Sequence, residues 1–516
     1  MTGDERRLVA ASRKRNLRNS AIKAAVLIVL PLLLFGLLVS QVFAKWNDLE
    51  EANSNATRSL AANDGAIALA EALEAERLRT AWQLRFFPLK ALDETIGENL
   101  FNALQTREVY REKIGHTALN LRDCAVALDE HNRPLFTTRN GKPTFDGFAL
   151  PDGLSSTAPS PGKTTCDPVS RTIAYLQNSP DAPKYGYKPE PFVFIWQKGS
   201  VSNMPFPNPT VEAKPRPPLG FVIAPGGMKI AFSLDLGLNA SAITVLDRAS
   251  GKQTLLAGLG DGEMLGFSQD GRYLLLNDYP GVDFVDISSP KPHASELVRL
   301  HDFNDVAAGK VGNSQVVAVS GDKDLLVQSL TGNEKLVFLP AGPDSVVSGL
   351  KPTGVAISSD GKMVASDSGG RIDLWGIEPD DSAQGSGWLG MPSHEGNFKA
   401  GPERTEYRAF SPDSQFLATL EVGRNHIGPY VTYSYGNTQP TTAADINALH
   451  VSVWKVQPYS SQDLKGKTTT ALFGMGCALI GNYIADMATN PDIREDNQHF
   501  DFGGLQKACT SAQAGR

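Results

Sequence analysis

The residues best suited to covalent chemistry in this sequence are four cysteines, which fall into two local pairs. Cys124 and Cys166 lie early in a turn-rich region, and Cys477 and Cys509 lie near the C-terminus. The sequence has no CxxC segment and no Cys/His cluster at the spacing of zinc ligands, which disfavours a zinc site. The pattern indicates either two disulfides, each stabilising by roughly 3–4 kcal/mol in the chain-entropy description, or four buried thiols.

Motifs for catalysis or cofactor binding are missing from the sequence. Gly162-Lys163-Thr164 would end a Walker A motif, but Thr157 stands where that motif needs a glycine. His394-Glu395 lacks the second histidine of HExxH, and no GxSxG, CxxCH or EF-hand segment occurs. We therefore expect no catalytic residue, no metal site and no cofactor.

One segment predicts a membrane anchor. Residues 24–39 read AAVLIVLPLLLFGLLV, and the apolar stretch over 22–44 would form a helix of about 35 Å, against a hydrocarbon core of about 30 Å. The preceding segment, 1–21, is basic, so the positive-inside rule places the N-terminus in the cytoplasm and the remaining chain across the cytoplasmic membrane, in the periplasm or its equivalent. A cleaved signal peptide ending at Val42-Phe43-Ala44 is the alternative.

The distribution of charge along the chain disfavours a nucleic-acid partner. The net charge is −7 although residues 1–23 contribute +5, which leaves −12 on the rest of the chain. A nucleic-acid-binding protein needs a basic face, so we expect no nucleic-acid partner. An oxidising compartment outside the membrane favours the disulfides Cys477–Cys509 and Cys124–Cys166.

The segment 45–115 predicts a helical stalk. Residues 67–84 are rich in Ala, Leu, Glu and Arg, and Asp64 is a candidate N-cap for this helix. Pro88 indicates the start of a second helix, over 88–105. The stalk could mediate homo-oligomerisation, or it could form a helical hairpin that packs on the next domain.

A repeated unit follows the stalk. Each copy has an apolar residue, a polar turn, an alternating strand, a second turn and a closing strand. The clearest copies begin with FSQDG (267–271), ISSDG (357–361) and FSPDS (410–414), which contain Asp270, Asp360 and Asp413. Weaker copies begin near 124, 171, 223 and 316, which gives a period of about 45 residues. Asp-Gly and Pro-Asp favour tight turns between antiparallel strands.

These residues resemble WD repeats, a family of β-propellers with four strands in each blade. Trp375 and Trp454 stand where the family places its closing Trp-Asp, and we interpret them, with the three turn aspartates, as structural blade residues. His301 and His394 lie near inter-blade positions and are interpreted in the same way. We expect a mainly β fold with a propeller over 116–460, seven blades being favoured over six or eight. The insertion 424–447 is a candidate binding loop.

The tail over 468–516 is predicted to be helical and to pack beside the stalk or beneath the propeller. The order of parts over 22–509 resembles the membrane segment, helical linker, propeller and Cys-to-Cys tail of bacterial signalling proteins that join a NACHT-type ATPase to WD repeats. In that family an ATPase and an effector precede the membrane segment, but here only about 21 residues do. The resemblance therefore implies a sensor half that needs a separate protein partner.

We predict a membrane-anchored, non-enzymatic propeller that acts as a binding, scaffold or sensor module. A periplasmic enzyme with its site at the propeller channel is one alternative. An envelope assembly scaffold resembling TolB-like propellers is another.

Overall fold

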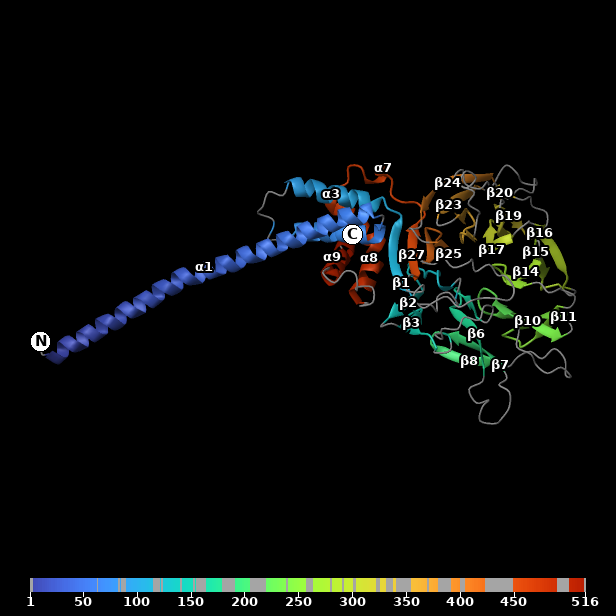
Figure 1. Cartoon of the computed structure of the whole chain (residues 1–516), viewed down its shortest axis with the longest axis horizontal. Helices are drawn as coiled ribbons and strands as arrows, with labels where there is room; N and C mark the ends of the chain where they lie inside the picture. The colour runs from blue at the N-terminus through green and yellow to red at the C-terminus, as the bar shows by residue number, and fades with distance from the viewer. Residues whose placement is uncertain are drawn as a thin grey trace, which may run out of the picture. The chain divides into compact units, whose positions relative to one another are not determined.

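A computed structural model gives the structure of this chain, which divides into a helical unit and a strand-rich unit (Figure 1). The helical unit comprises Met1–Thr106, Tyr459–Ile484 and Asp501–Arg516, and the strand-rich unit comprises Arg107–Pro458 and Ala485–Phe500. The structure describes residues 3–62, 64–81, 84, 90–114, 121, 124–139, 142–151, 154, 164–178, 191–204, 220–237, 240–256, 263–278, 281–289, 292–299, 303–321, 325–330, 337–339, 354–368, 371–378, 391–399, 404–422, 449–489 and 501–514.

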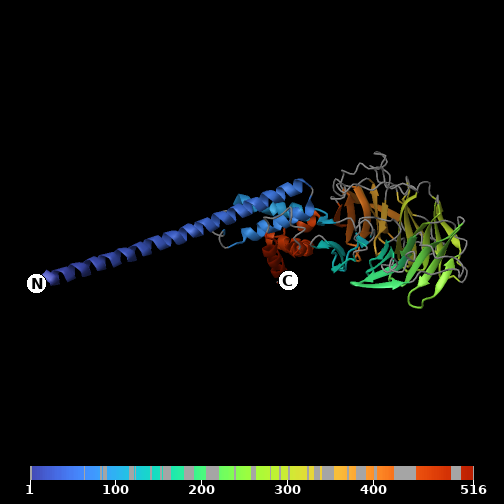
Figure 2. The same cartoon turned by 60° about the horizontal axis from the view of Figure 1, so that its bottom comes forward.

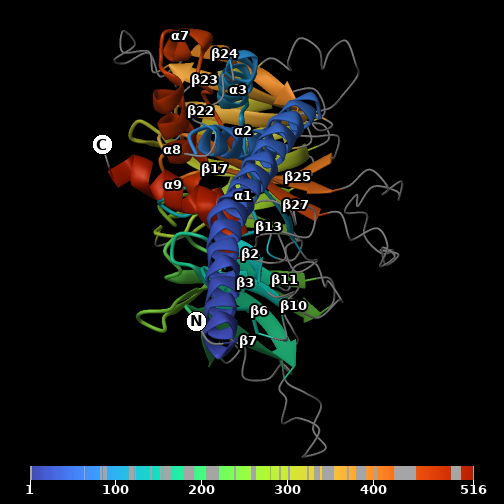
Figure 3. The same ribbon diagram turned by 90° about the vertical axis from the view of Figure 1, so that its left-hand side faces the viewer.

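The helical unit gathers around the C-terminal half of one long helix (Figures 1 and 3). Its helices are α1 Gly3–Ala61, α2 Gly65–Arg79, α3 Lys90–Leu104, α7 Ser461–Leu464, α8 Thr469–Thr489 and α9 Phe502–Ala514. A shared core joins the first three, and it contains Leu49 of α1, Leu78 of α2 and Ile96 of α3. The C-terminal part of α1, α2 and α3 therefore pack together, and the last helix of this group ends at Leu104.

Helix α2 is the central helix of this unit. Asp64 is its N-cap, and the Asp64 side chain accepts a hydrogen bond from the Ile67 backbone N–H at 3.4 Å, as the sequence predicts. Buried positions run almost all round α2 and include Leu69, Leu73 and Leu78. Because α2 buries its apolar residues within its own chain, an oligomer through the stalk would have to use other surface.

Two helices in the described residues are long and apolar enough to cross a membrane, and their environments differ. In α1 the apolar side chains around Pro31 are exposed; Leu27 is 74% and Phe35 is 66% exposed. Figure 2 shows this part of α1 extending as a single helix without a packing partner. In α8, by contrast, 44% of the most apolar 18-residue stretch is buried, as expected for a core helix. The expected segment 22–44 therefore lies within a longer helix that continues into the stalk.

A buried carboxyl lies between α1 and α2. Glu71 is 6% exposed, and its Oε2 accepts a hydrogen bond from Ser59 Oγ at 2.8 Å. Burial raises the pKa of Glu71 from 4.5 to about 7, while the Ser59 hydrogen bond opposes this shift. The folded state therefore holds a proton on Glu71 that the unfolded state releases above about pH 4.5.

We expect the helical unit to lose stability as the pH rises from about 4.5 to 7. In this window the folded state binds more protons, so the free energy of unfolding falls with pH, by at most about 3 kcal/mol for Glu71. Helical circular dichroism during thermal unfolding at pH 5 and pH 8 measures the change. Glu71→Gln should remove much of the difference, whereas Glu51→Gln, at an exposed position on α1, should keep it. Equal pH dependence in both variants would contradict this assignment.

The described strands form seven antiparallel sheets, and this arrangement is a seven-blade β-propeller (Figure 1). The first sheet has three strands, β2 Phe136–Arg139, β3 Lys142–Phe145 and β4 Phe148–Ala149. The next three sheets each have four strands: β5 Thr164–Asp167, β6 Thr172–Asn178, β7 Pro191–Gln197 and β8 Ser200–Met204; β9 Gly220–Ile223, β10 Lys229–Gly237, β11 Ala240–Asp247 and β12 Gln253–Leu256; β13 Glu263–Phe267, β14 Tyr273–Asp278, β15 Gly281–Asp286 and β16 Ala294–Arg299.

The last three sheets also have four strands, and the first strands of neighbouring sheets contact one another in turn from β5 to β25. These first strands are therefore the inner strands of the ring, and the fourth strands form its rim. The strands are β17 Phe303–Val311, β18 Ser314–Gly321, β19 Leu325–Ser329 and β20 Val337–Leu339; β21 Gly354–Ile357, β22 Met363–Ser368, β23 Arg371–Glu378 and β24 Met391–Lys399; β25 Arg404–Phe410, β26 Phe416–Val422, β27 Leu449–Lys455 and β1 Glu108–Ile114.

Strand β1 closes the ring, because it supplies the outer strand of the last sheet. It pairs with β27 from Glu108 opposite Trp454 to Ile114 opposite Leu449. The propeller therefore begins near residue 107, within the range 45–115 that the sequence assigns to the stalk. Glu108 and Glu112 interrupt the apolar pattern of this strand in the sequence, although both side chains are buried.

Each unit contains one disulfide. Cys477 of α8 is bonded to Cys509 of α9, with Cα atoms 5.1 Å apart. Cys124 is bonded to Cys166 of β5, with Cα atoms 5.9 Å apart, so the segment that precedes the first sheet is covalently joined to the second blade.

Candidate functional site

Asp270, Asp360 and Asp413 occupy equivalent turns between the first and second strands of three blades. In each turn, a serine two residues earlier donates its hydroxyl to the aspartate, at 2.6, 2.7 and 2.6 Å respectively. The same serine oxygen accepts a hydrogen bond from the backbone N–H five residues further on. These carboxylates are therefore held as acceptors within the turns and stabilise the blades.

The pKa of Asp360 illustrates this role. Burial alone would raise the pKa, but hydrogen bonds from the Ser358 hydroxyl and the Lys362 backbone N–H outweigh burial and lower it. The pKa of Asp413 is lowered for the same kind of reason, with Ser411 as the principal donor. Both carboxylates therefore remain charged, and neither is poised for proton transfer near neutral pH.

Trp375 and Trp454 lie on the third strands of the last two blades and bond to the second strands. Trp375 is 3% exposed, and its indole N–H donates to Ser366 Oγ at 3.4 Å. Trp454 donates to Thr419 Oγ1 at 2.8 Å, and Thr419 donates to Glu421 at 3.1 Å. Both indoles therefore hold adjacent strands together.

The sequence also indicates two inter-blade histidines and a candidate binding loop. His394 stands opposite Trp375 in the β23–β24 register, while His301 lies outside the described residues. The insertion 424–447 also lies outside them; it connects β26 to β27. Among the residues that the structure describes, no three His, Cys, Asp or Glu side chains gather as a metal site would require.

An arginine that sequence reasoning missed joins three blades. Arg408 of β25 has a side chain only 2% exposed, and its guanidinium lies 3.6 Å from Asp367 of β22 and 3.7 Å from Asp305 of β17. A β-carbon at position 354 of β21 would overlap Arg408 Nη1, so Gly354 leaves room for the guanidinium. Asp305 also accepts a hydrogen bond from the Val355 backbone N–H at 3.0 Å. This network fixes the inner strands relative to one another.

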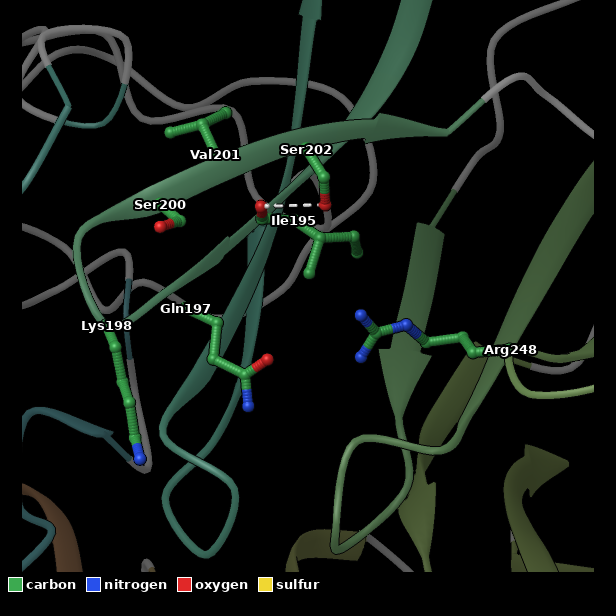
Figure 4. Close-up of a pocket in the computed structure, with 7 residues that line it drawn as sticks. All are labelled: Ile195, Gln197, Lys198, Ser200, Val201, Ser202 and Arg248. Atoms are coloured by element: carbon green, nitrogen blue, oxygen red, sulfur yellow. Dashed lines mark hydrogen bonds between the residues drawn. The ribbon is translucent and has the colours of Figure 1, made fainter.

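A shallow, open groove lies between the second and third blades. It has a volume of about 430 Å³. Figure 4 shows the β7–β8 hairpin along one side and Arg248, which follows β11, on the other. The lining residues are Ile195, Gln197, Lys198, Ser200, Val201, Ser202 and Arg248.

The groove lining is positively charged. Lys198 and Arg248 are its two charged residues, and neither forms an ion pair with a carboxylate in the described residues. Arg248 Nη1 donates to the Gly227 carbonyl at 2.7 Å, which anchors the guanidinium beside the groove. Ser202 Oγ donates to the Ile195 carbonyl at 3.4 Å. The guanidinium of Arg248 and the ammonium group of Lys198 favour a carboxylate over a cationic ligand on this surface.

Comparisons with known proteins add no assignment of function. No family model and no curated protein sequence matches the chain. A chain of the mitotic checkpoint complex is 15% identical, with a TM-score of 0.30 over 58% of this chain and 92% of that one. A chain from the complex of KlAtg21 with the coiled-coil of AgAtg16 is 13% identical, with a TM-score of 0.35 over 50% and 76% of the two chains.

A putative 6-phosphogluconolactonase from Bacteroides uniformis is 12% identical, with a TM-score of 0.33 over 49% of this chain and 76% of that one. These scores are too low to carry an argument about activity. The assignment to the propeller class instead follows from the seven sheets and the closing strand β1.

Proposed function

We propose that this protein is a membrane-anchored, non-enzymatic propeller that binds a protein partner on the outer side of the cytoplasmic membrane. The observation that carries the proposal is the exposed apolar part of α1, which is continuous with the helical unit. Exposed leucine and phenylalanine side chains along a helix of this length favour a lipid environment. The basic residues before this segment favour a cytoplasmic N-terminus.

The propeller is suited to binding because its strands hold surface loops and grooves in place. The network of Arg408 with Asp305 and Asp367 links three blades of the ring. Loops and grooves on such a scaffold can recognise a partner without losing much conformational entropy. In keeping with the resemblance to the sensor half of NACHT and WD-repeat signalling proteins, the bound partner would pass the signal onward.

Membrane anchoring is tested by a charge placed in the apolar part of α1. Leu33, 60% exposed, lies within the apolar run; Leu33→Arg should move much of the protein from the membrane to the soluble fraction, because arginine at the bilayer centre costs about 3 kcal/mol or more. Leu255, 51% exposed on β12, provides the matched control, and Leu255→Arg should leave the distribution unchanged. Equal distributions for both variants would argue against the anchor.

Orientation is tested by protease treatment of sealed vesicles. We expect the propeller to be digested in right-side-out vesicles and protected in inside-out vesicles. Protection in right-side-out vesicles, followed by digestion after lysis, would contradict the proposed topology. Crosslinking in intact membranes then tests for a bound protein partner.

A further inference from the structure

The outer edge of the second blade is an open strand beside the cationic groove. In the described residues, β8 pairs with β7 on one side and has no strand on its other side. Lys198 and Gly199 form the two-residue turn between these strands, with φ values of 48° and 79°. Positive φ at both residues is typical of a type I′ turn, whose twist matches the twist of the two strands that it joins.

The hairpin register determines which backbone groups face outward. Gln197 pairs with Ser200, and Ile195 pairs with Ser202. In an antiparallel hairpin with a two-residue turn, these pairs exchange hydrogen bonds across the two strands, whereas the intervening pair does not. The N–H and C=O of Val201 therefore point to the open edge, and the Val201 side chain is 48% exposed.

The same register places side chains towards the groove. Ile195, Gln197, Ser200 and Ser202 share one face of the hairpin, because residues two apart lie on the same face of a strand. All four line the groove, and Arg248 lies across from them in Figure 4. A further strand added to β8 would lie about 4.8 Å from it, and every second side chain would face the groove.

We propose that this groove binds an extended, acidic segment of a partner protein, which adds a strand to β8 and places a carboxylate against Arg248. The inference rests on the proposed binding function and identifies its site. Main-chain hydrogen bonds to Val201 supply affinity, and the arginine selects a carboxylate on an alternate side chain. Val201, which is 48% exposed, favours a small apolar residue in the same segment.

The experiment uses a library of random dodecapeptides displayed on phage and panned against the full chain in nanodiscs. We expect the enriched sequences to carry Asp or Glu among alternating apolar residues. A synthetic, fluorescently labelled form of an enriched peptide is then titrated by anisotropy. Arg248→Glu should weaken its binding at least tenfold, and Arg248→Lys should weaken it less.

Two further variants separate strand addition from simple charge attraction. Val201→Pro removes the outward N–H while remaining compatible with an edge strand, and it should also weaken binding at least tenfold. Lys252→Glu changes an exposed lysine in the turn after β11 and should alter binding less than twofold. Unchanged thermal unfolding of each variant verifies that the propeller is intact.

Enriched peptides without a carboxylate, or equal binding to wild type and Arg248→Glu, would overturn the site. Loss with Arg248→Glu but not with Val201→Pro would overturn strand addition. Either result can occur while α1 still anchors the protein and crosslinking still captures a partner, so failure of the groove is distinguishable from failure of the proposed function.

Discussion

Deletion of residues 468–516 is expected to unfold the helical unit, because helices α8 and α9 cover apolar surface of the stalk. Gly476 of α8 lies so close to Leu73 of α2 that a β-carbon there would be 2.8 Å from the leucine side chain. Leu472, Ile480 and Leu505 are also buried. Each buried side chain of this kind contributes roughly 1.5–3 kcal/mol, so the expected loss is several kcal/mol.

The melting temperatures of the full chain and of the truncated chain are compared in the same detergent. The helical circular dichroism signal monitors unfolding. The matched control ends at residue 510, which retains the Cys477–Cys509 bridge and removes only the last six residues. It loses the last turn of α9, with the hydrogen bonds from Gln513 Nε2 to the Cys477 carbonyl at 3.1 Å and from Ser511 Oγ to the Lys507 carbonyl at 3.0 Å. We expect a small change for this control. An unchanged melting temperature in the longer deletion would show that the tail does not support the stalk.

Gly361→Ala is expected to destabilise the propeller far more than Gly271→Ala, although both glycines occupy the same place in the repeated turn. Their φ values are +72° and +65°, and each backbone N–H donates to the serine carbonyl three residues earlier. Alanine in this left-handed conformation costs about 1–2 kcal/mol at either position. At position 361, however, the added β-carbon would overlap the Lys310 carbonyl oxygen of the neighbouring blade.

The comparison isolates the inter-blade contact from the backbone strain. At position 271 the nearest atom to an added β-carbon is the Ala224 β-carbon, at 3.4 Å, which is an ordinary contact. We therefore expect about 1–2 kcal/mol for Gly271→Ala and at least twice that for Gly361→Ala, because rigid backbone cannot move aside cheaply. Denaturant unfolding of the propeller, monitored by tryptophan fluorescence, measures the loss in the free energy of unfolding for each variant. Equal losses would mean that the two blades separate slightly to accommodate the methyl group.

The repeated turns show how much of this fold is local in sequence. A serine, an aspartate two residues later and a residue at positive φ complete their hydrogen bonds within six residues, so FSQDG and ISSDG are recognisable without tertiary information. The apolar run in α1 and the Asp64 cap are recognisable for the same reason. A propeller could therefore be predicted from the repeated unit, with seven blades favoured over six or eight.

Other features depend on residues far apart in the chain, and only the tertiary structure decided them. Strand β1 joins β27 across more than 300 residues, and its charged side chains conceal the strand pattern until their partners are known. Arg408 resembles an ordinary surface arginine until Asp305, Asp367 and Gly354 surround it. The groove is formed by β8 of one blade and Arg248 of the next. Sequence periodicity reports which face of an element is apolar, whereas a site between blades requires the packing that places those faces together.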